Sequence, residues 1–262
     1  MKIIDLTDEH KDIYFQCLED WSDEIKEAGD HKARWYENMK DRGLCVKLAL
    51  DDRDVVGGMI QYIPIEYSPA QGQHLYYIPC IWVHGHKKGR GNFQKKGMGK
   101  ALLQAAEADV RAKEMKGIVA WGLSLPFWMK ASWYKKRGYK KVDSMKGAVL
   151  LWKPFTEDAV SPKWIRKKKN PQKEEGKVVV TAFYNGVCTA QNMVFERAKR
   201  AAAEFGDKVE FREVCTFDRN VFLEWGINDG LYIDDKEVRM GPPPSYKKIK
   251  KMIAKKVRHL KL

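Results

Sequence analysis

The stretch Gln94-Lys95-Lys96-Gly97-Met98-Gly99-Lys100-Ala101-Leu102-Leu103 combines closely spaced glycines and lysines with the start of an apolar helical pattern. Glycine lets a backbone turn tightly and bring several N–H groups close to one ligand. The unpaired N–H groups and the positive dipole end of a following helix favour an anion at that place. We therefore predict a loop that binds a pyrophosphate group.

Two familiar phosphate-binding loops do not fit this stretch. A P-loop requires Ser or Thr after its Gly-Lys pair, because the hydroxyl binds magnesium, but Ala101 follows Gly99-Lys100. The dinucleotide-binding fingerprint requires a third glycine, which Ala101-Leu102-Leu103 does not supply at the required spacing. The loop is therefore a different kind of anion site.

Alternating strand and helix patterns surround the loop and indicate a mixed α/β fold. The predicted helices cover residues 6–28, 99–116 and 129–137, with Gly117 expected to end the second. One face of that second helix carries Met98, Leu102, Ala105, Ala106 and Val110. The predicted strands cover residues 44–50, 55–65, 75–83, 118–122, 139–142 and 148–152.

The alternation of strands and helices begins again after a basic, proline-flanked stretch. This second series predicts a smaller α/β domain. We expect strands at 178–184 and 209–214, a helix at 190–204 and a hairpin of 231–233 with 238–240. An amphipathic helix follows Pro242-Pro243-Pro244-Ser245, with Lys and Arg on its outer face. The predicted organisation is a domain over 1–155, a linker over 156–176 and a domain over 177–262.

Two sequence elements together resemble the GNAT acetyltransferase superfamily. Residues 94–99 match its Gln/Arg-x-x-Gly-x-Gly/Ala signature, and Ala131-Ser132-Trp133-Tyr134-Lys135-Lys136-Arg137-Gly138-Tyr139 is similar to its Ala-x-x-Tyr-x-x-x-Gly-Phe element. The resemblance covers residues 1–155 and implies a central mixed sheet flanked by helices, with acetyl-CoA as the co-substrate. It implies that the strand residues Ile81, Trp82 and Val83 contact the pantetheine arm, and that the loop binds the pyrophosphate through Gln94, Lys95, Lys96, Gly97, Met98, Gly99 and Lys100.

The same resemblance assigns a proton donor but leaves the base open. Tyr134 stands where the family often places the general acid, and a phenol is suited to protonating a leaving thiolate because it is neutral at pH 7. An amine with a pKa near ~10.4 must lose a proton before it attacks a thioester. Glu66 is the nearest carboxylate in the sequence, and His84 is another candidate. Residues 84–93 lengthen the loop beyond the family's usual size.

The second domain resembles the start of a thioredoxin-like fold, and the order of the two domains resembles YoaP-like proteins. Cys188 stands at the first position of a Cys-x-x-Cys motif before a helix, a place that lowers a thiol pKa. Gln191 replaces the second cysteine, and Asn228-Asp229-Gly230 stands where such domains often have a cis-proline. We interpret the domain as a specificity or partner module, with a thiol site at Cys188 as the alternative.

Composition limits the remaining function classes. The chain has 49 Lys and Arg against 35 Asp and Glu, but much of the excess charge lies in the glycine loop, the linker and the last helix. No stretch approaches the ~18 apolar residues of a membrane span. Five scattered cysteines argue against a disulfide framework and for the reducing cytoplasm.

The leading hypothesis is therefore an acetyl-CoA-dependent N-acetyltransferase that acts on a small-molecule or peptide amine without a metal. One alternative is a redox or sensor protein that works through Cys188 and binds CoA as a regulator. The other is a basic nucleic-acid-binding protein, which we rank last because no aromatic-interleaved platform or helix-turn-helix is recognisable. The sequence specifies neither the acceptor nor the oligomeric state.

Overall fold

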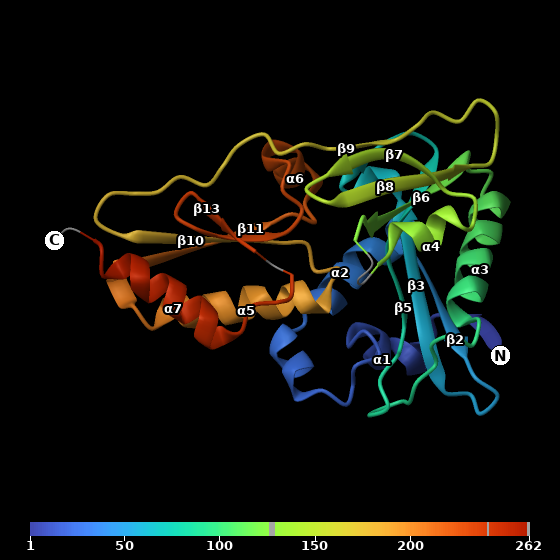
Figure 1. Cartoon of the computed structure of the whole chain (residues 1–262), viewed down its shortest axis with the longest axis horizontal. Helices are drawn as coiled ribbons and strands as arrows, with labels where there is room; N and C mark the ends of the chain where they lie inside the picture. Colours follow the sequence, from blue (N-terminus) through green and yellow to red (C-terminus); the bar gives the residue numbers. More distant parts are fainter. Residues whose placement is uncertain (126–128, 240, 261–262) are drawn as a thin grey trace. The chain divides into compact units, whose positions relative to one another are not determined.

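The computed structural model describes residues 1–125, 129–239 and 241–260, and it divides into two compact units (Figure 1). Unit 1 combines Met1–Trp21 with Asn38–Ile165, and unit 2 combines Ser22–Glu37 with Arg166–Leu262. The chain therefore leaves unit 1 early, contributes one segment to unit 2, and returns. The first ten residues of the predicted linker, 156–165, lie in unit 1. Within them, Lys163–Trp164 forms a short strand, β9, that pairs with β4 (Ala70–Gln71).

A seven-stranded mixed sheet forms the centre of unit 1, in the order β1-β2-β3-β5-β6-β8-β7. Every neighbouring pair is antiparallel except β5 and β6, which run parallel. This arrangement confirms the predicted mixed sheet. The strands are β1 (Lys2–Asp5), β2 (Cys45–Leu50), β3 (Val56–Pro64), β5 (Leu75–Val83), β6 (Gly117–Leu123), β7 (Lys140–Met145) and β8 (Ala148–Pro154).

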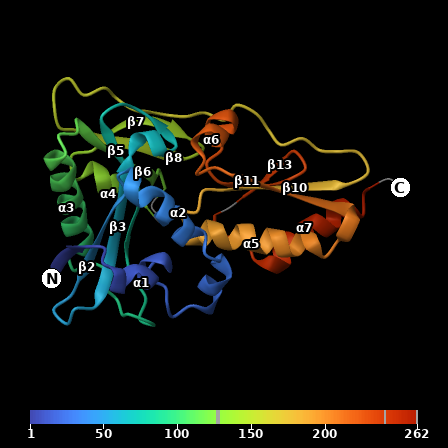
Figure 2. The same cartoon turned by 180° about the vertical axis from the view of Figure 1, so that it is seen from behind.

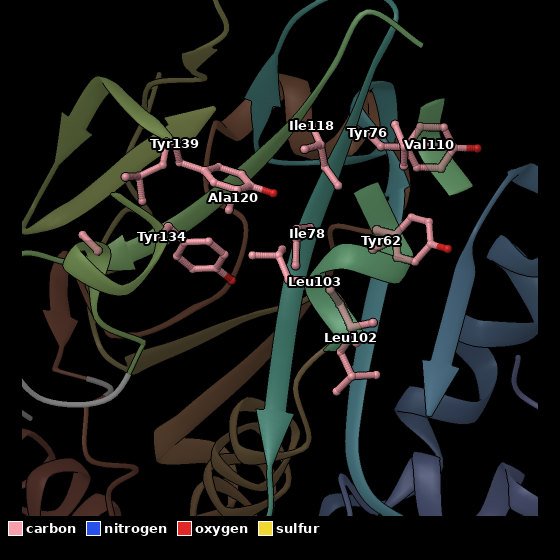
Figure 3. Packing of buried hydrophobic residues seen from close by; sticks show 14 of the residues in the cluster. Tyr62, Tyr76, Ile78, Leu102, Leu103, Val110, Ile118, Ala120, Tyr134 and Tyr139 are labelled. Atoms are coloured by element: carbon pink, nitrogen blue, oxygen red, sulfur yellow. The ribbon is translucent and has the colours of Figure 1, made fainter. Parts of the chain in front are cut away.

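The main helix of unit 1 is α3 (Met98–Ala112), and it packs its apolar face on the sheet. Leu102, Leu103 and Val110 lie against Ile78 of β5 and Ile118 of β6 (Figure 3). The prediction that Gly117 ends this helix is wrong. The helix ends at Ala112, and Gly117 begins β6, where a side chain would meet the backbone carbonyl of Lys153. The other helices are α1 (Lys11–Phe15), α4 (Ala131–Lys135), η1 (Asp8–His10), η3 (Lys40–Arg42) and η4 (Ile65–Tyr67).

The predicted continuous helix over 6–28 does not form. Cys17 and Leu18 have φ angles of 53° and 64°, which lie in the left-handed region that interrupts a right-handed helix. Leu18 is fully buried, so its packing holds the backbone in this conformation. The chain instead forms the short helices η1 and α1, a turn, and then η2 (Asp23–Ala28) in unit 2.

A four-stranded sheet forms the centre of unit 2, in the order β11-β10-β12-β13. β10 is parallel to β11 and antiparallel to β12, and β12 and β13 form a hairpin. Helices α5 and α7 lie on one face of this sheet and α6 lies on the other (Figures 1 and 2). The elements are β10 (Val178–Tyr184), α5 (Thr189–Ala203), η5 (Gly206–Lys208), β11 (Val209–Cys215), α6 (Arg219–Trp225), β12 (Gly230–Ile233), β13 (Lys236–Val238) and α7 (Tyr246–Val257).

The start of α7 follows the prediction, because the Ser245 side chain accepts a hydrogen bond from the backbone N–H of Lys248 at 3.3 Å. The apolar residues Ile249 and Ile253 are fully buried in the core of unit 2. Helix α6 was not predicted, although the Asp218 side chain caps it by accepting from the N–H groups of Asn220 and Val221. The last predicted hairpin residue, Met240, lies outside the described residues.

Ion pairs and hydrogen bonds hold the segment Ser22–Glu37 within unit 2. Arg197 of α5 is nearly buried and bonds the carboxylates of Glu27 and Glu24 at 3.1 and 3.2 Å, and Glu27 also pairs with Arg200. These bonds lower the pKa of Glu27 below its usual value. In helix α2 (His31–Met39), the His31 ring contacts the Glu196 carboxylate at 2.6 Å. A segment that follows the first part of unit 1 in the sequence is therefore bonded to α5 and belongs to unit 2.

Candidate active site

The parallel strands β5 and β6 separate halfway along their length. Their pairing runs from Leu75↔Gly117 to Ile78↔Ala120 and ends there, although both strands continue. Each strand then keeps only its outer partner, so that β5 pairs with β3 as far as Val83 and β6 pairs with β8 as far as Leu123. The sheet therefore opens between two strands whose outer edges are held.

A cleft of about 810 Å³ lies at this opening, a size typical of small-molecule sites. Three parts of unit 1 line it: the end of β5, the glycine loop with the start of α3, and helix α4 with the residues beside it. The lining residues are Ile81, Trp82, Val83, Phe93, Gln94, Lys95, Gly97, Met98, Gly99, Lys100, Met129, Lys130, Trp133, Tyr134 and Arg137.

The glycine loop presents the N-terminus of α3 to the cleft. Gly97 is the N-cap residue and has a φ of 88°, a conformation that favours glycine. No side chain caps the helix, and its first turn contains no acidic residue. The first N–H groups of this fifteen-residue helix are therefore available to an anionic ligand.

Among the described residues, four cations and no carboxylate line the cleft. Lys95 and Lys100 belong to the glycine loop, and Lys130 and Arg137 flank α4. The guanidinium carbon of Arg137 lies 3.7 Å from the centre of the Trp133 ring, and its Nη1 donates to the Trp133 carbonyl at 2.6 Å. Stacking holds this charge in place. The cleft is therefore suited to a polyanionic ligand.

Tyr134 places a phenol at the inner end of this cleft. Its side chain extends from α4 towards β5, the strand of Ile78 (Figure 3). The residue is 1% exposed, and among the described residues its hydroxyl has no hydrogen-bond partner. Burial, together with the nearby Cys80 thiol, raises the pKa of Tyr134, while Arg137 acts in the opposite direction. The phenol therefore stays protonated and can donate to a ligand.

The structure brings together most of the residues that the sequence predicted for the cofactor. All of them line the cleft except Lys96, whose ammonium lies 5.4 Å from the centre of the Phe93 ring. Sequence reasoning did not assign Phe93, Met129, Lys130, Trp133 or Arg137 to the cofactor site. The signal for two of these was present, since Trp133 and Arg137 are four residues apart in the quoted Tyr–Gly element and such residues lie side by side on a helical turn.

Neither candidate base lies in the cleft. Glu66 is exposed on η4, near Tyr76 at the start of β5, whereas the cleft lies at the far end of that strand. Five to seven residues of β5, about 17–23 Å of extended strand, separate Tyr76 from the residues of this strand that line the cleft. This placement argues against Glu66 as the catalytic base.

His84 is fully buried and anchors the long loop instead. Its Nε2 accepts from the indole N–H of Trp21 at 3.0 Å, so its Nδ1 carries the proton and donates to the Gly91 carbonyl at 2.7 Å. Its backbone bonds Gly57 and Phe93. Both ring nitrogens are therefore hydrogen-bonded, and the bonds from His84 to Gly91 and Phe93 join the two ends of the loop over 84–93. His84 therefore has a structural role.

Cys188 is the N-cap residue of α5 in unit 2 and is partly exposed. Its backbone carbonyl accepts from the N–H groups of Gln191 and Asn192. Within the described residues, no group of three or more His, Cys, Asp or Glu side chains could hold a metal ion. The helices of the same residues include none that is long and apolar enough to cross a membrane.

The opened mixed sheet, the anion-binding loop and the buried phenol are the parts expected of an acetyltransferase. The model of the Acetyltransferase (GNAT) family matches residues 4–139, and the chain therefore belongs to this family. An uncharacterized N-acetyltransferase of Bacillus subtilis (strain 168), YoaP, is 25% identical over 196 residues, which cover 72% of this chain and 72% of that protein.

Solved structures with a similar fold include two acetyltransferases. The GNAT family N-acetyltransferase YhbS from Escherichia coli, in complex with CoA, is 12% identical with a TM-score of 0.44, and the match covers 62% of this chain and 88% of that chain. A GNAT family acetyltransferase from Brucella melitensis, in complex with acetyl-CoA, is 16% identical with a TM-score of 0.41, covering 61% of this chain and 90% of that chain.

The cleft cations give a first testable prediction. We expect the double variant Lys100→Gln/Arg137→Gln to raise the Kd for acetyl-CoA about tenfold, because charge-assisted bonds to phosphate are lost. Titration calorimetry measures this effect. Lys135→Gln/Lys136→Gln removes the same charge from exposed residues of the α4 turn that do not line the cleft, and should leave the Kd unchanged. Equal effects of the two double variants would contradict the assignment.

Proposed function

We propose that the protein is an acetyl-CoA-dependent N-acetyltransferase that transfers the acetyl group directly to an amine. One observation carries the proposal: a single cleft joins a helix N-terminus suited to an anion to a buried phenol that has no hydrogen-bond partner among the described residues. Family membership supports the same reaction. The cleft residues fit a long ligand with phosphates at one end and a reactive group at the other.

Different residues of the chain bind the donor and take part in the reaction. The N–H groups of α3 and the side chains of Lys95, Lys100 and Arg137 hold the phosphates, and the β5 residues 81–83 align the pantetheine arm. Acetyl-CoA supplies the thioester. The amine nitrogen forms a bond to the acetyl carbon, the carbon–sulfur bond breaks, and the Tyr134 hydroxyl donates its proton to the departing thiolate. After attack, the newly acylated nitrogen gives up its extra proton to water, and water returns a proton to the Tyr134 phenolate.

This mechanism predicts a strong dependence on pH. Because no Asp, Glu or His of the described residues lines the cleft, the amine must reach it already neutral. We expect kcat/KM for a lysine-like amine to rise about tenfold per pH unit between about pH 6.5 and 9, since the amine pKa is ~10.4. The raised pKa of Tyr134 keeps the acid protonated across this range, so no decline should follow. A plateau near neutral pH would reveal a base within the protein and contradict this mechanism.

Binding of the donor tests the proposed function most directly. Titration calorimetry with acetyl-CoA and with CoA should show binding at micromolar concentration to the full chain. The product of acetyl transfer to a panel of amines can be followed by mass spectrometry and by release of the CoA thiol. Absence of acetyl-CoA binding at high micromolar concentration would overturn the proposal.

Unit 2 is proposed to be a thioredoxin-like domain that acts as a specificity or partner module. The strand order β11-β10-β12-β13, with one parallel pair and helices on both faces, supports this proposal. So does the position of Cys188 at the N-terminus of the helix that follows β10. The segment Ser22–Glu37 belongs to the proposed domain in addition to the residues after Ile165.

A further inference from the structure

Two buried N–H donors lie on the face of the β3–β5 pair that faces away from α3. Ile60 belongs to the core cluster that α3 covers, and the partly buried Ile81 and Val83 pack against that cluster. Side chains alternate along a strand, so the neighbours Gln61 and Trp82 point to the opposite face. Gln61 pairs with Cys80 in the strand register, which makes Trp82 its diagonal neighbour at about 7 Å.

Gln61 is anchored at one end of its amide and unpaired at the other. The residue is 0% exposed, and its Oε1 accepts from the Tyr14 hydroxyl at 2.6 Å. This bond leaves Nε2, with its two N–H groups, directed elsewhere. Among the described residues Nε2 has no hydrogen-bond partner. Tyr14 comes from α1, so α1 lies on this face of the sheet.

Trp82 presents a second donor of the same kind. Its indole Nε1 is buried and has no acceptor among the described residues. Trp82 also lines the cleft, unlike Gln61. Buried donors are rarely left unpaired, because each loses its bonds to water without replacement. Two of them on one face indicate a ligand that brings acceptor atoms.

The two donors lie beside the reacting end of the cleft. Cys80, opposite Gln61, is close enough to Tyr134 to affect the pKa of the phenol. Trp82 is two residues further along β5, at the opening between the strands. A ligand that bonds Gln61 and Trp82 would therefore lie next to the thioester rather than next to the phosphates.

We propose that Gln61 and Trp82 determine acceptor specificity by donating hydrogen bonds to an oxygen-bearing amine, such as an amino acid amide, a peptide or an amino alcohol. The proposal rests on the proposed acetyltransferase function and names its acceptor class. An alkylamine of the same length carries no acceptor atom for these donors. A site built to bond an oxygen discriminates strongly against the analogue that lacks it.

The test compares matched amines with the full chain and acetyl-CoA. Glycinamide, β-alaninamide, ethanolamine and a tripeptide are each paired with an alkylamine of similar length, and thiol release gives kcat/KM. Each rate is referred to the concentration of neutral amine, because the amines differ in pKa. We expect the oxygen-bearing member of each pair to have a kcat/KM at least tenfold higher than its alkyl partner.

Variants then test whether the two side chains cause this preference, expressed as the ratio of kcat/KM for the oxygen-bearing amine to kcat/KM for its alkyl partner. Gln61→Met keeps the length of the side chain without its N–H groups, and Trp82→Phe keeps a ring without the indole N–H. Each should reduce the ratio to about three or less, through KM rather than kcat. The ratio cancels any common change in acetyl-CoA affinity, which calorimetry measures separately, and thermal melting identifies a variant that does not fold.

Two further variants serve as controls. Trp164→Phe removes another buried indole N–H of unit 1, which has no acceptor among the described residues and does not line the cleft. This variant should leave the ratio unchanged. Tyr14→Phe removes the anchor of Gln61 while keeping Nε2, so it should reduce the ratio less than Gln61→Met does.

The outcomes separate the two proposals. If the protein binds acetyl-CoA but acetylates no oxygen-bearing amine, or prefers the alkylamines, the acceptor assignment is overturned and the proposed function is not. The same holds if the ratio persists in both folded variants, Gln61→Met and Trp82→Phe. Failure to bind acetyl-CoA overturns the proposed function and, with it, this inference.

Discussion

Replacing Tyr134 by Phe is expected to lower kcat at least 100-fold, the lower end of the range for loss of a general acid. The departing thiolate then has no proton donor, because among the described residues no other neutral hydroxyl lines the cleft. The ring itself remains and keeps its packing in the core. We therefore expect the Kd for acetyl-CoA to stay within about twofold, which calorimetry and steady-state kinetics together measure.

Tyr139→Phe is the matched control for this prediction. Tyr139 is a buried tyrosine whose ring centre lies 5.3 Å from that of Tyr134, but it does not line the cleft. Its variant should retain nearly full kcat. A similar loss in both variants would show that packing rather than proton donation is the role of Tyr134, and an equal loss of kcat and acetyl-CoA affinity would place Tyr134 in binding.

Trp35→Ala is expected to destabilise unit 2 by about 3–5 kcal/mol, the usual cost of truncating a buried tryptophan. Trp35 is 2% exposed although it precedes most of unit 1 in the sequence. It packs so closely on Gly186 of unit 2 that a side chain there would lie 2.8 Å from the Trp35 Cβ. Hydrogen exchange followed by mass spectrometry should therefore show faster exchange in β10 and α5.

The control for this second prediction is Trp21→Ala. Trp21 is 39% exposed, lies in unit 1 and bonds His84 of the long loop. Its loss should increase exchange in residues 84–93 while leaving β10 unchanged. If Trp35→Ala instead loosened β2 and β3 of unit 1 with β10 unaffected, the assignment of Ser22–Glu37 to unit 2 would be wrong.

The cofactor loop could be predicted from sequence because its signals are local. Gly97 and Gly99 mark a tight turn, and Leu102, Ala106 and Val110 repeat at helical spacing, so the start of α3 follows from residues that are neighbours in the chain. Prediction of a helix failed where the local sequence pattern conflicts with side-chain packing in the folded chain. The pattern over residues 6–28 has helical spacing, yet the burial of Leu18 in a left-handed conformation interrupts the helix.

The same distinction between local sequence signals and tertiary contacts applies to the proposed catalytic residues. Tyr134 was found through its motif, and the structure places it at the cleft. Glu66 was chosen as the nearest carboxylate in the sequence, but distance along a chain says little about distance across a sheet, and Glu66 lies at the other end of β5. Gln61 gave no signal at all, since a buried glutamine becomes informative only when its hydrogen-bond partners are known.

The amino-acid sequence by itself determined the glycine loop, the family resemblance, the positions of most strands along the chain and the excess of positive charge near an anion site. The tertiary structure alone decided where β5 and β6 separate, which donors lack partners, and that Ser22–Glu37 belongs with Arg166–Leu262. The physical reason is how far apart in the sequence the interacting residues lie. Turn conformation and helical periodicity arise from residues a few positions apart, whereas strand separation, hydrogen-bond satisfaction and unit membership arise from residues that meet only after the chain has folded.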